Sequence, residues 1–346
     1  MRIEHSPFGT FYNSKVKQIT LANDNGMSVS ILQLGGIITH LYVPNVNGEI
    51  ADVVLGLDNL AAYTLDTHYI GALIGRVANR IEGAKFELEG ETINIDGNAY
   101  QGKHCVHGGR FGYHRRIWEE VETQHNDNDI SVTLRLLDAD GEEGFRHNVN
   151  VLATYTLDNN NILTLKFNAN TDGITPVNLT AHSYFNLYGH QAGSIGEHTL
   201  TIFTDALLEQ KEDRLPNGNI IPLKTPELCF QKPKRLSADL IKGVEVNHSY
   251  VFTTVDDEST QLNKMARLEG DGRVLTVYSN EKTLHFYNGH NLDGVDGKDN
   301  ARYPKYAGLC LEPKGYVNAI NEPSFPCTTI TPSKHYEHTI IYDFNQ

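Results

Sequence analysis

Residues 149–169 read VNVLATYTLDNNNILTLKFNA and decide the fold class. Two runs flank the turn sequence DNNN at residues 158–161, and each carries an apolar side chain at every second position: Val149, Val151, Ala153 and Tyr155, then Leu163, Leu165, Phe167 and Ala169. Side chains of a strand point alternately to its two faces, so each run predicts a strand with one buried face. The Asp/Asn turn between them predicts an antiparallel hairpin.

The same alternation recurs along the chain. It is present within residues 132–136, 275–277 and 340–344, and further turn sequences lie at 138–141, 216–219 and 270–272. Helical periodicity is scarce. Residues 58–63 predict a short helix capped by Asp58 or Asn59, and residues 237–241 predict another. We therefore expect a mainly β protein.

The length of 346 residues allows two domains, but all-β sandwiches often exceed about 200 residues as one unit. No low-complexity linker or Pro/Ser-rich break divides the chain. We expect residues 1–346 to form a single domain. A content of 39% hydrophobic and 21% charged residues is ordinary for a globular protein with a substantial core.

The formal net charge is −14, from 29 basic and 43 acidic residues. Such a chain should be repelled by nucleic acid and by anionic membrane surfaces. The first residues lack the apolar segment of a signal peptide, and no stretch approaches the roughly 20 apolar residues of a membrane span. The four cysteines match no zinc or CxxC spacing, which favours free thiols. We expect a cytoplasmic protein with no nucleic-acid or membrane partner.

Residues 178–187, NLTAHSYFNL, carry opposite chemistry on their two faces. With a period of two, Thr180, His182, Tyr184 and Asn186 share one face, and Ala181, Ser183, Phe185 and Leu187 share the other. Hydroxyl, imidazole, phenol and amide groups suit an uncharged polyhydroxylated ligand, and the imidazole can also transfer protons near neutral pH. This face predicts a sugar site. The alternative is the solvated outer face of an antiparallel strand.

Two further segments carry candidate site residues. Residues 75–81, GRVANRI, are followed by HGGRFG at 107–112, where the glycines should let the backbone approach a ligand beside His107. Residues 308–313, GLCLEP, place Glu312 on the same strand face as the small residues Gly308 and Cys310. The space above this carboxylate is therefore expected to be open, which makes Glu312 a candidate base.

Together these motifs resemble the aldose 1-epimerase (galactose mutarotase) family. GRVANRI, HGG followed by Trp118, VNLTAHSYFNL, and GLCLEP followed by NEPSFP occur in the family's order over nearly the whole chain. The resemblance implies a large antiparallel β-sandwich, a galactose mutarotase-like supersandwich with few short helices. It also implies a site in an open cleft on one sheet.

The activity implied by the resemblance is interconversion of the α and β anomers of a free aldose, galactose or glucose by default. This reaction needs a base at the C1 hydroxyl and an acid at the ring oxygen, without metal or cofactor. The resemblance assigns Glu312 as the base and His182 as the acid, with His107 assisting at the ring oxygen. The residues that it assigns to sugar binding are Arg76, Asn247, His285, His104 and Tyr184.

Four positions depart from the family pattern. His104, Ala181, Asn247 and His285 stand where the family usually has Asn, Asn, Asp and Gln. An Asp to Asn change replaces a charged acceptor by an amide with two donors, although Glu245 nearby is a possible substitute. Another aldose, a disaccharide or a modified sugar therefore stays open as the substrate, as does the choice between monomer and homodimer.

Other functions compete with this interpretation. A noncatalytic carbohydrate-binding protein would share the polar strand face but would not need Glu312 near His182, and a glycoside hydrolase or lyase would need a second carboxylate. Glu312 could also be a buried carboxylate paired with Arg or Lys. A zinc site at His104 and His107 is disfavoured, because residues three apart on a strand point to opposite faces. Most remaining histidines are expected at the surface, including His68 and His338.

Overall fold

The computed structural model describes residues 1–237, 243–253 and 261–345. The hairpin predicted from residues 149–169 is confirmed: β13 (Val149–Asp158) pairs antiparallel with β14 (Ile162–Thr171). The predicted helix is α1 (Leu60–Leu65), and the Asn59 side chain caps it by accepting a hydrogen bond from the Ala62 amide. The second predicted helix, at 237–241, lies outside the described residues except for Ser237.

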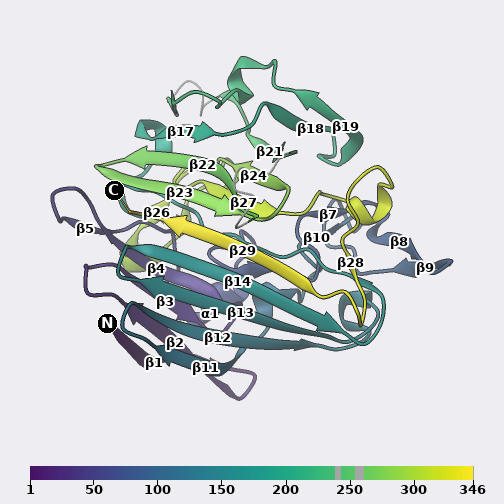
Figure 1. Cartoon of the computed structure of the whole chain (residues 1–346), viewed down its shortest axis with the longest axis horizontal. Coiled ribbons are helices and arrows are strands. Elements are labelled where there is room, and N and C mark those ends of the chain that lie inside the picture. Colours follow the sequence, from purple (N-terminus) through teal and green to yellow (C-terminus); the bar gives the residue numbers. More distant parts are fainter. Residues whose placement is uncertain (238–242, 254–260, 346) are drawn as a thin grey trace.

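Within the described residues the largest sheet has nine antiparallel strands, and Figure 1 shows this sheet as a broad layer facing the viewer. Their spatial order is β11 (Glu119–His125), β12 (Asp129–Asp138), β13, β14, β29 (Tyr336–Asp343), β23 (Arg273–Ser279), β22 (Asn263–Gly270), β17 (Thr199–Ile202) and β20 (Lys234–Arg235). The strand β29 pairs with β14 on one side and with β23 on the other, so the two halves of the sheet are joined only when the C-terminal strand is in place.

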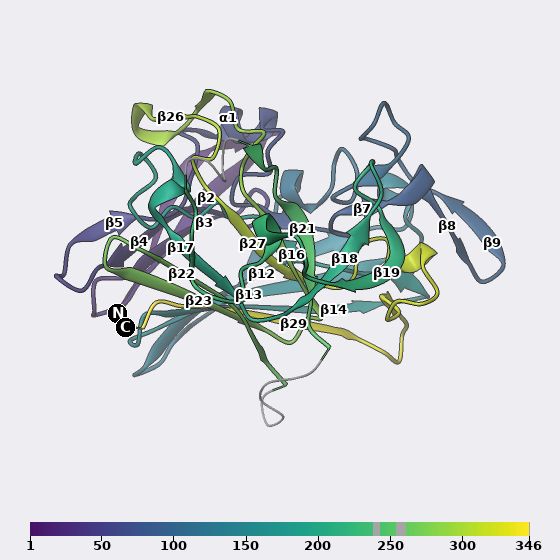
Figure 2. The same cartoon turned by 90° about the horizontal axis from the view of Figure 1, so that it is seen from above.

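Two five-stranded antiparallel sheets lie on one side of this layer (Figure 2). The first contains β1 (Arg2–Phe11), β2 (Ser14–Ala22), β3 (Ser28–Leu32), β4 (Ile37–Pro44) and β5 (Ile50–Asp52) in sequence order. The second contains, in spatial order, β19 (Pro216–Pro222), β18 (Ala206–Gln210), β21 (Asn247–Val251), β24 (Thr283–Tyr287) and β27 (Cys310–Lys314).

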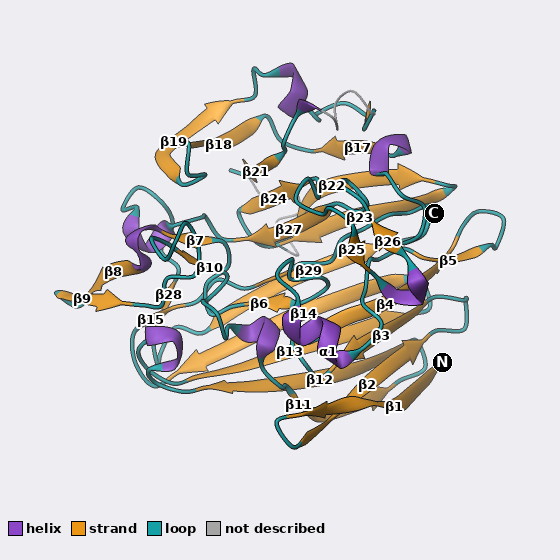
Figure 3. Cartoon of the chain, turned by 180° about the vertical axis from the view of Figure 1, so that it is seen from behind, coloured by secondary structure: helices purple, strands orange, loops and turns teal. Residues whose placement is uncertain are grey.

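The remaining elements are short and lie in the connections, as the view from behind shows (Figure 3). Within the described residues, short strands of two to four residues form five two-stranded sheets. These are β7 (Arg80–Ile81) with β10 (Cys105–Val106), β6 (Leu73–Ile74) with β16 (Thr180–Ala181), β8 (Lys85–Leu88) with β9 (Glu91–Asn94), β15 (Thr175–Pro176) with β28 (Thr329–Ile330), and β25 (Val295–Asp296) with β26 (Arg302–Tyr303). The 3₁₀ helices are η1 (Glu82–Ala84), η2 (Tyr113–Arg115), η3 (Glu142–Gly144), η4 (Ile195–Glu197), η5 (Pro226–Leu228), η6 (Lys298–Asn300) and η7 (Ala319–Asn321).

One apolar cluster holds the layers together. It joins Leu21 of the first small sheet, Val151 and Leu165 of the large sheet, and Leu311 of the second small sheet, all fully or almost fully buried. The expected large antiparallel β-sandwich with few short helices is therefore confirmed. The four cysteines are free thiols, as expected. Among the helices of the described residues, none is long and apolar enough to cross a membrane.

Candidate active site

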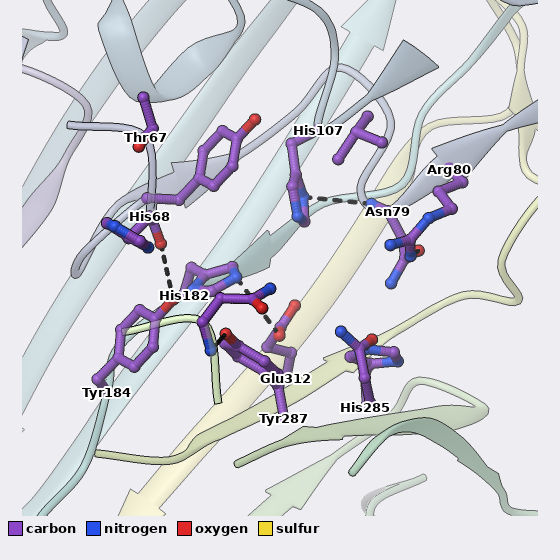
Figure 4. A pocket seen from close by; sticks show the side chains of 14 residues that line it. Thr67, His68, Asn79, Arg80, His107, His182, Tyr184, His285, Tyr287 and Glu312 are labelled. Atoms are coloured by element: carbon purple, nitrogen blue, oxygen red, sulfur yellow. Dashed lines mark hydrogen bonds and ion pairs between the residues drawn. The ribbon is translucent and has the colours of Figure 1, made fainter. Parts of the chain in front are cut away.

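A pocket of about 160 Å³ lies where the second five-stranded sheet meets the connections around β7, β10 and β16. Figure 4 shows its side chains converging from these elements. Its lining residues are Thr67, His68, Tyr69, Asn79, Arg80, Val106, His107, His182, Tyr184, Asn247, His285, Tyr287, Asn291 and Glu312. His68, which we expected at the surface, is thus part of a pocket wall.

The pocket brings together Glu312 and His182, the two residues predicted to carry proton transfer. Glu312 lies on β27, and His182 directly follows β16, held there because its amide donates to the Ala72 carbonyl at 2.9 Å. His182 Nε2 lies 3.7 Å from Glu312 Oε1, as the dashed line in Figure 4 shows. Both side chains are almost completely buried. This separation lets one sugar contact both groups while the pair itself stays too far apart for a strong hydrogen bond.

The predicted two faces of residues 178–187 are confirmed in part, since Thr180 and Asn186 of the polar face do not line the pocket. Ala181 and Phe185 pack into the main apolar cluster, while His182 and Tyr184 line the pocket. The alternative of a solvated strand face is wrong, because the polar residues are buried. Regular strand pairing ends at Ala181, however, and Thr180 bonds to a backbone carbonyl instead of lining the pocket.

A buried lysine accompanies the carboxylate. Lys314 Nζ lies 3.4 Å from Glu312 Oε2, and neither side chain is exposed by more than 2%. The two residues are two apart on β27 and so share a strand face. The alternative that Glu312 is a buried carboxylate paired with a lysine is therefore correct. Glu312 nevertheless also lines the pocket. Lys314 occupies Oε2 and leaves Oε1 directed toward His182.

His107 presents a neutral N–H donor to the pocket. Its Nδ1 accepts a hydrogen bond from the Asn79 amide at 3.3 Å, so the ring proton resides on Nε2. Burial, and after it the charge of a protonated His182, lowers the pKa of His107 well below its usual value. The ring lies edge-on to His182, with centroids 5.4 Å apart. His107 is thus placed to donate a hydrogen bond to a ligand that contacts His182.

The glycines after His107 lie against other parts of the chain. Gly108 has φ of +78°, and a Cβ there would lie 2.0 Å from the Gly75 carbonyl oxygen. A Cβ at Gly109 would meet the Glu143 carboxylate at 2.1 Å. The expectation that these glycines let the backbone approach a ligand stays a prediction. Gly108 lets two backbone segments pass close together, which helps to fix the position of His107.

Asn247 and His285 line the pocket, and Ser249 extends their hydrogen-bonded chain away from the lining. The strand order β21, β24, β27 aligns Ser249, His285 and Glu312 across the sheet. Ser249 Oγ lies 2.8 Å from His285 Nδ1, and His285 Nε2 lies 2.8 Å from Asn247 Oδ1. Burial, followed by the charges of Lys314 and Arg80, lowers the pKa of His285 well below its usual value. The imidazole is therefore neutral.

The structure does not bring two of the expected sugar-binding residues into the pocket. Arg76 is 1% exposed, and its Nε donates to Asp138 Oδ2 at 2.7 Å while Nη1 donates to the Arg146 carbonyl. His104 is fully buried and accepts a hydrogen bond from the Gly83 amide. Both side chains are used to hold neighbouring connections together.

Arg80, four residues beyond Arg76, lines the pocket instead. The segment GRVANRI contains both arginines, and no periodicity within it distinguishes them. Asn79 has φ of +64°, so the chain turns sharply between the two. Sequence reasoning also missed further polar or aromatic lining residues: Thr67, His68, Tyr69, Asn79, Tyr287 and Asn291. Glu245, considered as a substitute acceptor, is exposed and bonds to Arg214 outside the lining.

Among the described residues, one group has the donor types of a metal site: His182, Cys310 and Glu312, whose ligand atoms all lie within 4.8 Å of one another. His182 turns Nδ1 toward Cys310 Sγ at 3.5 Å and Nε2 toward Glu312, so the two contacts use different ring nitrogens. The Lys314 ammonium also lies against Glu312. A single metal ion needs the donor atoms of its ligands to face one point together. Here the two ring nitrogens of His182 face different residues, so the geometry fits a proton-transfer pair better than a metal site.

Comparison with known proteins agrees with the geometry. The family model described as aldose 1-epimerase matches residues 17–343. The galactose mutarotase of Sus scrofa is 36% identical over 335 residues, 95% of this chain and 94% of its own. The aldose 1-epimerase of Haemophilus influenzae is 32% identical over 331 residues, 93% of each chain. The crystal structure of an aldose epimerase homologue from C. elegans superposes with a TM-score of 0.85 at 27% identity, covering 94% of this chain and 97% of that one. The chain therefore belongs to the aldose 1-epimerase family.

Proposed function

We propose that the protein is an aldose 1-epimerase that interconverts sugar anomers with Glu312 as general base and His182 as general acid. The observation that carries the proposal is the 3.7 Å separation of His182 Nε2 and Glu312 Oε1 at one polar pocket. Relatives at 32–36% identity are named galactose mutarotase or aldose 1-epimerase. Galactose and glucose are accordingly the default substrates.

The reaction follows from the position of the two groups. Glu312 Oε1 removes the proton of the C1 hydroxyl, the bond between C1 and the ring oxygen breaks, and protonated His182 delivers its Nε2 proton to the ring oxygen. The product is an open-chain aldehyde. Rotation about the C1–C2 bond exposes the other face of the carbonyl, and the same two proton transfers in reverse close the ring as the other anomer. Both groups then hold their starting protons.

Other side chains support these transfers. His107 Nε2–H is a neutral donor beside His182 and would stabilise negative charge that develops at the ring oxygen. Tyr184 donates its hydroxyl to the His68 carbonyl at 2.8 Å, which fixes one wall of the pocket. Arg80 lies on the side opposite Tyr184 (Figure 4), and Asn247, which is hydrogen-bonded to His285, also lines the pocket. Both side chains would bind substituents of the sugar. No cofactor is required by this chemistry.

The competing functions explain less of the site. A glycoside hydrolase uses two carboxylates, whereas Glu312 is the only carboxylate among the pocket residues that the structure describes. A noncatalytic sugar-binding protein would gain nothing from a buried carboxylate kept close to a buried imidazole, because burying both groups costs stability.

The expected single domain over residues 1–346 is part of this proposal, supported by the apolar cluster that joins all three large sheets. A cytoplasmic location accords with the free cysteines. The monomer or homodimer state and the lack of nucleic-acid and membrane partners stay predictions.

Polarimetry tests the function. Freshly dissolved α-D-galactose and α-D-glucose should reach their equilibrium rotation faster with enzyme than in buffer, without a change in the final rotation. A rate equal to that of buffer for all aldoses in a panel would contradict the proposal. Release of new reducing ends from glycosides would instead indicate hydrolysis.

A further inference from the structure

The hydrogen bonds around His285 determine which atoms Asn247 turns toward the pocket. Ser249 is fully buried, and the partner of its hydroxyl among the described residues is His285 Nδ1. The hydroxyl proton has an acceptor only if Nδ1 is unprotonated, which puts the ring proton on Nε2. His285 Nε2–H then donates to Asn247 Oδ1. The amide oxygen is thereby occupied, and the NH₂ group of Asn247 is what remains for a ligand.

Arg80 adds a positive charge at the same side of the pocket. Figure 4 shows Arg80 and His285 on the side opposite His68 and Tyr184. Arg80 Nη1 donates to the Asn79 side chain at 2.9 Å, and its Nε is buried without a partner. Within the described residues no carboxylate lies in ion-pair distance of Arg80. Asp213 acts on it at longer range only.

The charge balance of the pocket is positive. Glu312 is the lining carboxylate, and Lys314 already pairs with it at 3.4 Å. Burial lowers the pKa values of His107 and His285 well below their usual value, so these two rings add little charge at neutral pH, and His182 in its protonated form, the proposed acid, adds positive charge. The guanidinium of Arg80 is therefore left without a compensating anion from the pocket wall. A half-buried cation and an NH₂ group that line the same pocket form a donor set that suits an acceptor with two oxygens.

We propose that the preferred substrate of this pocket is an aldose that carries a carboxylate, an aldohexuronate, bound through that carboxylate by Arg80 and Asn247. This proposal rests on the proposed epimerase function and specifies its substrate class. Asp at position 247 would repel a carboxylate, whereas Asn donates to it. Replacement of the family's usual Asp by Asn247 is thus explained as a change in the charge of the ligand.

The net charge of −14 does not oppose this assignment. Charges elsewhere on the surface are largely screened beyond about 8 Å at physiological ionic strength. The contact between a carboxylate and Arg80 would form inside the pocket, where the screening is weaker.

The experiment compares kcat/KM for D-galacturonate and D-galactose, each added as its α anomer and followed by polarimetry. The wild-type protein should favour the uronate. In Asn247→Asp the ratio of uronate to galactose should fall by about 10- to 100-fold, the usual worth of a charge-assisted contact. Asn47→Asp, in the exposed turn between β4 and β5, makes the same charge change outside the pocket and should preserve the wild-type ratio.

The outcomes separate this proposal from the function on which it rests. A wild-type ratio of one or less, or a ratio that Asn247→Asp leaves unchanged, overturns the carboxylate assignment while galactose turnover still supports an aldose 1-epimerase. Failure to accelerate either sugar overturns both. A ratio above one that falls in Asn247→Asp and not in Asn47→Asp supports the assignment.

Discussion

Replacing Glu312 by Gln should separate the catalytic role of this carboxylate from its structural role. The substitution keeps the size of the side chain but removes the proposed base and the anion beside the buried Lys314. Without a base, turnover should fall by about 10²- to 10⁴-fold. Stability should fall as well, because Lys314 must either stay charged without its anion or lose a proton.

The size of the stability loss can be estimated from Lys314. Neutralising a lysine with an ordinary pKa of about 10.4 at neutral pH costs about 4.6 kcal/mol, since each pKa unit corresponds to about 1.36 kcal/mol. Breaking a buried ion pair from one side typically costs about 3–5 kcal/mol. We therefore expect Glu312→Gln to lower the free energy of unfolding by about 3–5 kcal/mol.

The double variant Glu312→Gln/Lys314→Met removes both charges and should regain most of that stability. Its turnover should stay as low as that of Glu312→Gln. Urea unfolding can be followed by the fluorescence of Trp118, the single tryptophan, which is fully buried. Polarimetry gives the activity, and Glu89→Gln, in the exposed turn between β8 and β9, controls for loss of a charge. Near-normal activity in the double variant would refute the base assignment, and unchanged stability in Glu312→Gln would refute the pairing.

Further predictions concern pH, the two arginines and metal. Burial lowers the pKa of His182, and the charge of Glu312 offsets this lowering only in part. The value of kcat/KM should therefore decline as the pH rises through the pKa of His182, which lies below about 6.5. A kcat/KM that stays constant up to about pH 8 would contradict protonated His182 as the acid. Arg80→Met should raise KM with a small change in stability, whereas Arg76→Met should destabilise the fold; the reverse pattern in kinetics and urea unfolding would contradict their placement. Dialysis against a chelator should leave activity intact, and restoration of lost activity by one divalent ion would overturn this. Burial lowers the pKa of His338 to about 3 and that of His198 to about 4. As the pH falls below about 6.5, these two histidines therefore take up protons in the unfolded chain before they do so in the folded protein. Each histidine should lower the free energy of unfolding by about 2 kcal/mol by about pH 5, and a free energy of unfolding that does not depend on pH would refute this.

Strand alternation predicted much of the site because it depends only on local geometry. The run at residues 178–187 placed His182 and Tyr184 on one face, and the run at 308–313 placed Glu312 beside small residues. The same rule could have indicated Lys314, which shares a face with Glu312 two positions away. The hairpin at 149–169 was predictable for the same reason.

Other features depend on contacts between distant segments and were not predictable from local pattern. Arg80 lines the pocket in place of Arg76 because the chain turns between them, and because Asp138, 62 residues away, binds Arg76. His338 was expected at the surface but is fully buried. Its Nδ1 lies 3.1 Å from the Leu179 carbonyl, 159 residues away, and its Nε2 contacts a serine hydroxyl. Such partners satisfy a polar group only in the complete fold.

Magnetisation-transfer NMR on an equilibrium mixture of α- and β-D-galactose is the most direct test of the central claim, anomer interconversion by Glu312 and His182. Catalytic amounts of the wild-type protein should produce exchange between the two C1 proton signals well above the rate in buffer. In heavy water neither C1 nor C2 should lose its proton, because ring opening breaks no C–H bond. The Glu312→Gln/Lys314→Met variant should lose this exchange. Exchange at the buffer rate with the wild type, or undiminished exchange with the folded variant, would contradict the account.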